Sequence, residues 1–156
     1  AGKLVCKVIG AAKGWNYRSK FVDGLAVGSY KKKLGAAWLS KNLENVEKYA
    51  ADPLSGFTFT VNAYYHMFSG MAKMNQQEKA GKTPKNLPIF FVAGEEDPVG
   101  NYGKGVENVY HKYVAAGYED VNIKLYEGDR HEILNEMNSN EVYSDILAWV
   151  NKKLKV

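Results

Sequence analysis

The sequence predicts an α/β fold with a parallel pair of strands, in which helices alternate with the strands. Two runs are typical of strands: residues 89–93 are continuously apolar, and residues 121–126 alternate apolar and polar side chains. A helical pattern over residues 103–117 lies between them, and another, with Ser139 expected as its cap, follows the second strand. Because this order is that of a βαβ unit, we expect parallel strands joined by a right-handed crossover.

The first part of the chain carries two helical patterns separated by an irregular stretch. Apolar residues recur at helical spacing over residues 3–12, and Gly14 then interrupts the pattern. Residues 15–36 mix glycines, aromatics and lysines with no clean period, so we expect a loop-rich stretch with short helical turns. Ser40 is expected to cap the next helix, which should end before Pro53 because the residue before a proline avoids the helical conformation.

A longer helix is predicted from Thr60 to about Lys79. Its apolar residues fall on or near one broad stripe, which comprises Val61, Tyr64, Tyr65, Phe68, Met71, Ala72 and Met74. Residues 81–88 then form a polar connection that contains lysines and prolines. We place the boundary of the chain's organisation here, between residues 1–85 and residues 86–156.

Composition limits the class of protein and its partners. The 156 residues suffice for one domain or part of one, and 46% hydrophobic with 24% charged residues is ordinary for a globular protein. The formal net charge of +4 comes from lysines spread along the chain. No stripe of arginines interleaved with aromatics accompanies them, so we expect no nucleic-acid partner.

Cysteine and histidine usage argues against crosslinks and metal sites. Cys6 is the single cysteine, which excludes an internal disulfide and a paired-cysteine metal site. This usage fits a cytoplasmic location, where we place the protein, or simply a fold that needs no crosslinks. His66, His111 and His131 lack the spacing of metal ligands, so no metal is expected. No run approaches the roughly 20 apolar residues of a transmembrane segment, and no secretory leader is visible.

A carboxylate and a histidine follow the two predicted strands. Asp97 lies in the acidic turn after the first strand, and His131 lies on the loop after the second. Reacting groups of open α/β sheets gather at the carboxyl ends of strands, and acid followed by histidine is the order that ends a Ser…Asp…His triad. The alternatives are an Asx-type turn opened by Asp97 before Pro98, and a surface histidine beside a helix start. Taken together, the pair favours a catalytic role.

The nucleophile of such a triad is not apparent in this sequence. It requires a Gly-x-Ser-x-Gly turn between a strand and a helix. Ser29 follows Gly28 without a preceding strand, and Ser55 precedes Gly56 without the first glycine. Two parallel strands are also too few for a stable sheet, and their edges would expose unpaired backbone groups. We therefore expect an upstream segment, a second chain or self-association into a homodimer to complete the sheet.

Aromatic residues around the long helix are candidates for substrate contact. Phe57, Tyr64, Tyr65 and Phe68 would suit an apolar cleft that binds an acyl chain. Ordinary packing of the helix explains the same residues, and both can hold for different faces.

The two loops resemble those of a known family. The run FFVAGEEDPVGNYGKGV, residues 90–106, resembles the acid loop of bacterial α/β-hydrolases of the lysophospholipase and monoacylglycerol-lipase-like type, which are often grouped with serine aminopeptidase-like hydrolases. The run LYEGDRHEILNE, residues 125–136, resembles the histidine loop of that group. The resemblance places the family's triad acid on Asp97 and its histidine on His131.

Two upstream runs resemble the helical cap of the same group, FVDGLAVGSY at residues 21–30 and DPLSGF at residues 52–57. The resemblance implies the C-terminal portion of an α/β-hydrolase fold, with residues 1–85 as the helical cap or lid. Residues 86–156 would supply the last two parallel strands with their helices. It further implies no metal or organic cofactor, and a nucleophile and oxyanion loop located upstream.

We therefore expect a serine hydrolase that acts on carboxylic esters, with lipid-like or small ester substrates such as lysophospholipids or monoacylglycerols. An alternative is a catalytically inactive fragment or interaction module that associates through an open sheet edge. A thioesterase or peptidase on the same fold is a third.

Overall fold

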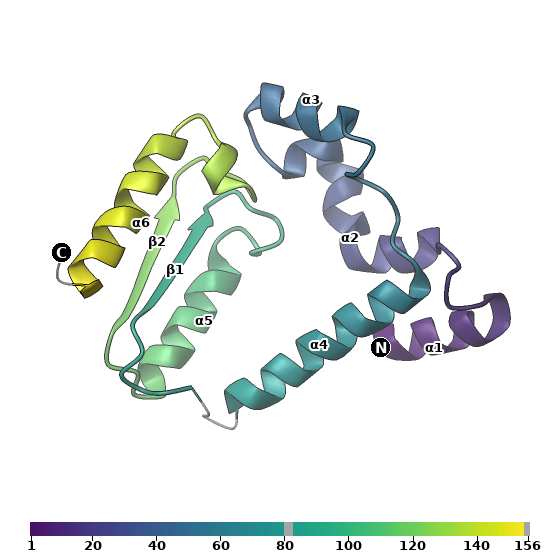
Figure 1. Cartoon of the computed structure of the whole chain (residues 1–156), viewed down its shortest axis with the longest axis horizontal. Coiled ribbons are helices and arrows are strands. Elements are labelled where there is room, and N and C mark those ends of the chain that lie inside the picture. Colours follow the sequence, from purple (N-terminus) through teal and green to yellow (C-terminus); the bar gives the residue numbers. More distant parts are fainter. Residues whose placement is uncertain (80–82, 155–156) are drawn as a thin grey trace. The chain divides into compact units, whose positions relative to one another are not determined.

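The computed structural model describes residues 1–79 and 83–154 (Figure 1). It divides into two compact units that interleave along the chain. The first unit combines Ala1–Lys33 with Asp52–Thr83, and the second combines Leu34–Ala51 with Pro84–Val156. Residues 34–51, which lie within the region expected to be the cap, therefore cluster with the strands and their helices.

The first unit is helical. Its helices are α1 (Gly2–Lys13), α2 (Lys20–Leu34, whose last residue belongs to the second unit) and α4 (Val61–Lys79). Its core comprises Cys6, Val22, Val61 and Tyr64, with Val5, Ile9, Ala26, Tyr65 and Phe68 packed around it. The predicted helices over residues 3–12 and from Thr60 are thus confirmed, because each has apolar residues that recur on the face turned to this core.

The amino end of α4 is capped by side chain and backbone together. The Thr60 hydroxyl accepts a hydrogen bond from the Ala63 N–H at 3.2 Å. The Tyr17 carbonyl accepts from the Val61 N–H at 2.8 Å, and the Trp15 carbonyl accepts from the Asn62 N–H at 3.0 Å. These bonds satisfy the N–H groups that the first turn of a helix leaves without partners.

Helix α2 corrects the expectation of a loop-rich stretch over residues 15–36. Buried Ser19 starts it, since its hydroxyl accepts a hydrogen bond from the Val22 N–H at 3.3 Å. The apolar pattern of the sequence did not predict this helix, because Val22 is its single buried residue among those described and because Gly24 and Gly28 interrupt the pattern.

The segment that enters the second unit holds a short 3₁₀ helix, η1 (Gly35–Trp38), and then α3 (Leu43–Ala51). The predicted end before Pro53 is confirmed, but Ser40 as the helix cap is wrong, because α3 begins three residues later. The Ser40 hydroxyl instead accepts a hydrogen bond from the Asn42 N–H at 2.9 Å and donates one to buried Glu136 at 2.8 Å. The hydroxyl of Ser40, which the local sequence pattern assigns to a helix cap, thus binds the carboxylate of Glu136, a residue distant in the sequence.

Strands β1 (Ile89–Gly94) and β2 (Val121–Tyr126) are parallel, as predicted. Their register runs from Ile89 opposite Val121 to Gly94 opposite Tyr126. Helix α5 (Lys104–Ala115) connects them, and Gly117 closes it with a φ of 77°. Helix α6 follows β2; it begins at Ser139 itself, which is therefore its first residue rather than its cap.

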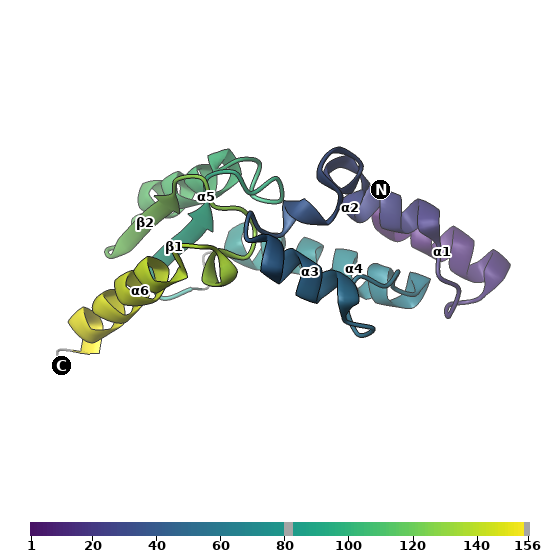
Figure 2. The same ribbon diagram turned by 90° about the horizontal axis from the view of Figure 1, so that it is seen from above.

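Helices α5 and α6 (Ser139–Leu154) cover opposite faces of the strand pair (Figures 1 and 2). Phe90 stacks on Trp149 of α6 with ring centroids 5.4 Å apart, while its neighbour Phe91 meets Tyr113 of α5 at 5.5 Å. Since successive strand residues point to opposite faces, these two contacts place one helix on each face.

The burial of β1 is less complete than expected. Residues 89–93 are half-buried, and only Gly94 at the carboxyl end is buried. Among the described residues no third strand pairs with either edge, so one helix on each face leaves part of each strand accessible. The core of this unit sits toward α6, where Tyr126, Ile133 and Val142 are buried against Val92 and Ile146.

Candidate active site

Asp97 lies in the turn after β1 and is buried, with 7% of its surface exposed. Its Oδ1 accepts a hydrogen bond from the Val99 N–H at 2.8 Å, which is the Asx turn that the sequence suggested as an alternative. The Asp97 carbonyl accepts from the Tyr102 N–H at 2.8 Å, where Tyr102 has a left-handed φ of 54°. The turn fixes one carboxylate oxygen and leaves Oδ2 to face the second loop.

His131 meets that oxygen. Its Nδ1 lies 3.0 Å from Asp97 Oδ2, so the structure brings the two residues together at the carboxyl ends of β1 and β2. The hydrogen bond to Asp97 raises the pKa of His131 above its ordinary value; burial opposes the shift, and the charges of Asp97 and Glu132 add to it. With the proton on Nδ1, Nε2 is the nitrogen that can take up another proton.

The two loops are joined through their backbones. The Glu95 N–H donates to the Tyr126 carbonyl at 2.9 Å, and the Glu96 N–H donates to the Asp129 carbonyl at 2.8 Å. A Cβ atom on Gly94 would lie 2.2 Å from the Arg130 carbonyl oxygen. Glycine at this position therefore allows the histidine loop to approach the end of β1 closely enough for Asp97 to reach His131.

Residues 37–45, which we call the strap, run along the histidine loop. Arg130 Nη1 donates to the Ala37 carbonyl at 2.6 Å, and the Glu132 N–H donates to the Leu39 carbonyl at 2.8 Å. The ring of Trp38, itself 9% exposed, lies 5.0 Å from the imidazole of His131 at a tilt of 42°. Trp38 thus covers part of one face of the imidazole.

Further bonds extend the contact between the strap and the loops. Lys41 pairs with Glu96 of the acid turn at 2.7 Å. The Asn42 side chain donates to the Asn135 carbonyl at 3.1 Å, and Asn45 donates to Glu132 at 2.6 Å. Sequence reasoning missed the strap, because nothing in its composition signals a partner more than 80 residues away.

Two carboxylates of the histidine loop are buried beside the pair. Glu136 is 3% exposed and is hydrogen-bonded to the strap, as described for Ser40. Asp129 is 6% exposed, its Oδ2 has no hydrogen-bond partner, and burial raises the pKa of its carboxyl group. Sequence reasoning singled out neither residue, because a carboxylate in a polar loop normally faces solvent.

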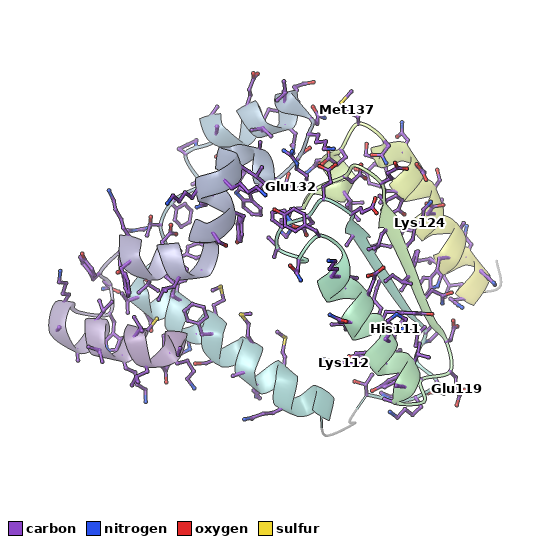
Figure 3. All side chains as sticks on the ribbon, turned by 180° about the vertical axis from the view of Figure 1, so that it is seen from behind. His111, Lys112, Glu119, Lys124, Glu132 and Met137 are labelled. Atoms are coloured by element: carbon purple, nitrogen blue, oxygen red, sulfur yellow. The ribbon has the colours of Figure 1, made fainter. Side chains whose placement is uncertain are left out.

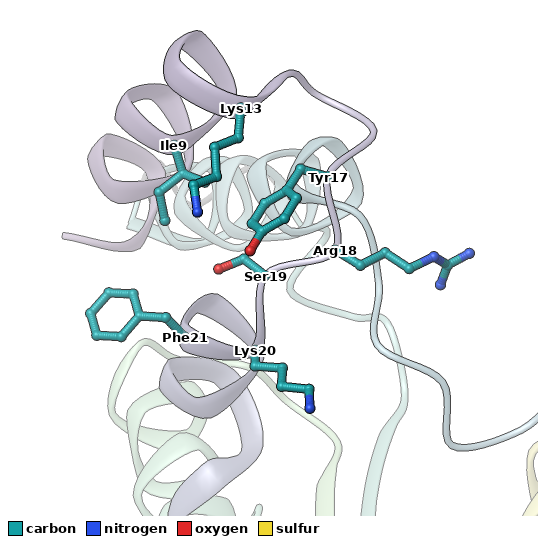
Figure 4. A pocket seen from close by; sticks show the side chains of 7 residues that line it. All are labelled: Ile9, Lys13, Tyr17, Arg18, Ser19, Lys20 and Phe21. Carbon is teal, nitrogen blue, oxygen red and sulfur yellow. The ribbon is translucent and has the colours of Figure 1, made fainter.

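The four aromatic residues predicted to contact substrate all lie in the first unit. Tyr64 is 3% exposed and its hydroxyl is hydrogen-bonded to Asp23, so it is part of the core; Tyr65 and Phe68 are half-buried and Phe57 is exposed. A pocket in this unit is lined by Ile9, Lys13, Tyr17, Arg18, Ser19, Lys20 and Phe21, and by none of those four (Figure 4). Their role in substrate binding stays a prediction.

The remaining histidines, His66 on α4 and His111 on α5, are exposed. Figure 3 shows His111. Within residues 1–79 and 83–154, no group of three or more His, Cys, Asp or Glu side chains is arranged to hold a metal ion. No helix in the same ranges combines the length and apolar character needed to cross a membrane.

Comparison with known proteins shows the family to which the chain belongs. Residues 7–138 match the family model described as serine aminopeptidase, S33. A monoacylglycerol lipase from Mycolicibacterium smegmatis is 28% identical over 135 residues, which are 85% of this chain and 45% of that protein. The chain thus spans about half the length of this curated relative.

Solved structures agree with the match. A thermostable carboxyl esterase from Bacillus coagulans has a TM-score of 0.68 and 26% identity, covering 96% of this chain and 51% of the other. A lipase in an open form has a TM-score of 0.83 and 24% identity, with coverages of 97% and 51%. These structures confirm the predicted fold class, part of an α/β-hydrolase with a helical cap. With the family model matching most of its length, the chain belongs to the serine aminopeptidase S33 family.

Proposed function

We propose that this chain supplies the acid and the histidine of a carboxylic ester hydrolase, whose serine is contributed by a segment upstream. The observation that carries the proposal is the 3.0 Å contact between buried Asp97 and His131 at the carboxyl ends of two parallel strands. The names of the similar proteins, a monoacylglycerol lipase and a carboxyl esterase, support an ester as substrate.

In this mechanism His131 moves the protons. Its Nε2 takes the proton of the serine hydroxyl as the serine oxygen attacks the ester carbonyl, and the imidazolium then gives that proton to the departing alcohol. Water repeats the two steps on the acyl-enzyme and releases the carboxylic acid. Asp97 remains ionised throughout and keeps the Nδ1 proton of His131 directed toward itself.

We further propose lysophospholipid-like or monoacylglycerol-like substrates, with residues 1–85 as the cap and residues 86–156 as part of the hydrolase core. Exposed Phe57 and half-buried Tyr65 and Phe68 would contact the acyl chain, and buried Tyr64 would support them. The chemistry requires no metal or organic cofactor. The single cysteine supports a cytoplasmic location.

A second candidate function is supported by the half-buried strands, whose edges lack strand partners among the described residues. A catalytically inactive interaction module would use such an edge to bind a second polypeptide or another copy of itself. A peptidase, which the family description supports, is a variant of the first proposal.

The test uses the full-length polypeptide that carries this chain. Treatment with a fluorophosphonate probe and measurement of the intact mass should reveal one covalent adduct on a serine outside residues 1–156. Asp97→Asn and His131→Ala should each lower the turnover of monoacyl esters by about 10³-fold or more without changing the circular dichroism. Glu127→Gln, on the exposed side of the same loop, is the control. Near-full activity of either triad variant would contradict the proposal, and absence of labelling would favour the interaction module.

A further inference from the structure

Glu136 is a buried carboxylate with a complete set of hydrogen-bond donors. Its Oε1 accepts from the Arg130 N–H at 2.9 Å, and its Oε2 accepts from the Ser40 hydroxyl at 2.8 Å. The Lys41 N–H lies 3.0 Å from both oxygens. Glu136 therefore joins its own loop to the strap through the Ser40 side chain and the Lys41 backbone.

The donors to Glu136 belong to the two segments that contact the imidazole of His131. Arg130 immediately precedes His131, so its N–H holds the backbone from which the imidazole projects. Ser40 and Lys41 come shortly after Trp38, whose ring packs 5.0 Å from the imidazole. Glu136 therefore holds two things together, the loop that carries His131 and the segment that carries the ring against it.

Burying the carboxylate of Glu136 costs hydration free energy. Burial of an ionised group is strongly unfavourable unless hydrogen bonds replace its hydration. Here two backbone N–H groups and a hydroxyl replace it, and both oxygens must be acceptors. A glutamine of the same shape keeps only one acceptor oxygen and turns an NH₂ group toward the Ser40 hydroxyl, which would have to change from donor to acceptor, so the neutral replacement loses the charge-assisted bonds of the carboxylate.

We propose that Glu136 is a positioning residue for His131, which holds the imidazole against Asp97 Oδ2 by anchoring both the histidine loop and the strap. As far as turnover is concerned, the inference rests on the proposed hydrolase function. The positioning itself is a property of the folded chain and can be measured without any substrate.

The main experiment compares Glu136→Gln with wild type by NMR of the imidazole of His131, in the full-length polypeptide that carries this chain. In the wild type we expect a protected Nδ1 proton and a titration above the ordinary histidine range. In Glu136→Gln we expect faster exchange of the Nδ1 proton and a titration shifted back toward that range. Glu141→Gln is the matched control, because Glu141 makes an exposed ion pair with Lys124 and should leave both signals unchanged.

Glu136→Asp separates geometry from charge. It keeps the negative charge but is one methylene shorter, so it cannot reach Arg130 and Ser40 together. We expect a change in the same direction as in Glu136→Gln. Unchanged signals of His131 in both variants, with native circular dichroism, would overturn the proposal and leave Glu136 with a purely structural role.

If both Glu136 variants fail to fold, Ser40→Ala can still test the positioning role of Glu136. It removes one donor and leaves the carboxylate and the backbone donors in place, so a smaller shift of the His131 titration in the same direction is expected. No shift in a folded Ser40→Ala protein would then overturn the proposal.

Turnover measurements distinguish this inference from the proposed function. If the hydrolase function holds, Glu136→Gln should lower kcat about 10-fold to 100-fold with little change in KM, because a misplaced general base slows the chemical step more than substrate binding. If wild type has no esterase activity but the NMR signals respond as expected, the hydrolase proposal fails and the positioning role stands.

Discussion

At the residue scale, the two oxygens of Asp97 have different tasks. Oδ1 closes the turn after β1 through the Val99 N–H, and Oδ2 meets His131. The Asx turn that the sequence offered as the alternative is therefore present, and it is compatible with the proposed role of Asp97 as the triad acid. A carboxylate held on one side by its own turn loses little further freedom when it orients an imidazole, which favours a preorganised pair.

The pKa shift of His131 predicts a pH dependence of stability. Since the pKa of His131 in the folded protein is raised above its ordinary value of 6.5, the Asp97–His131 interaction stabilises the fold fully below that value and less as the pH rises through the folded pKa. Asp97→Asn should therefore lower the free energy of unfolding more at about pH 6 than at about pH 9. Chemical denaturation at the two pH values measures the difference, and in a His131→Gln background it should vanish.

Gly94 is the residue where the two loops come closest. Gly94→Ala would put a Cβ atom 2.2 Å from the Arg130 carbonyl oxygen, and backbone on both sides leaves no flexible group to yield. We expect a loss of about 3 kcal/mol or more in the free energy of unfolding, measured by chemical denaturation. At Gly100 the nearest atom to an added Cβ is 3.4 Å away, so Gly100→Ala should cost far less. Equal losses would contradict this account.

At the scale of the elements, local pattern predicted those with a strong period. Both strands and α1, α4 and α5 were predicted within one or two residues, because each alternates or repeats its apolar residues against a neighbour. Helix α2 was missed, since its interior glycines and exposed Phe21 and Leu25 obscure the period. Its formation depends on the Ser19 cap and on packing of Val22 in the first core.

The glycines of α2 offer a way to strengthen this helix. Apart from the chain neighbours and the adjacent backbone of the helix itself, no atom lies within 4 Å of a Cβ added to Gly24 or Gly28. Each change to alanine should raise the free energy of unfolding of the first unit by about 0.5–1 kcal/mol, because alanine loses less backbone entropy in a helix. Gly14→Ala is the contrasting variant. Gly14 has a φ of 86°, which an alanine rarely adopts, so this change should lower the free energy of unfolding. Thermal denaturation followed by circular dichroism would reveal opposite signs.

At the scale of the whole molecule, the chain leaves the first unit after residue 33, contributes residues 34–51 to the second, and returns to the first at residue 52. The strap and α3 are therefore part of the unit that holds the candidate site. A boundary drawn along the sequence could not represent this, because the Pro- and Lys-containing connection near residue 85 marks only one of the three crossings.

Hydrogen exchange can test this division. Gly94→Ala destabilises the second unit, so the amides of Lys41 and Glu132, which bond across the strap and the histidine loop, should exchange faster. The amides within α1 and α4 should change much less. Equal acceleration in α1 and α4 would show that the two units open as one cooperative structure.

The sequence alone determined the strand–helix–strand order, the acid turn and the histidine loop, because each depends on interactions between residues close along the chain. It also pointed to Asp97 and His131 as a pair, since parallel strands bring their carboxyl ends together. Only the tertiary structure decided that Trp38 lies against His131, that Ser40 serves a distant carboxylate and that Glu136 is buried. Those contacts join segments about 95 residues apart, and a pairing at that distance depends on how the strap and the loop pack rather than on any local pattern.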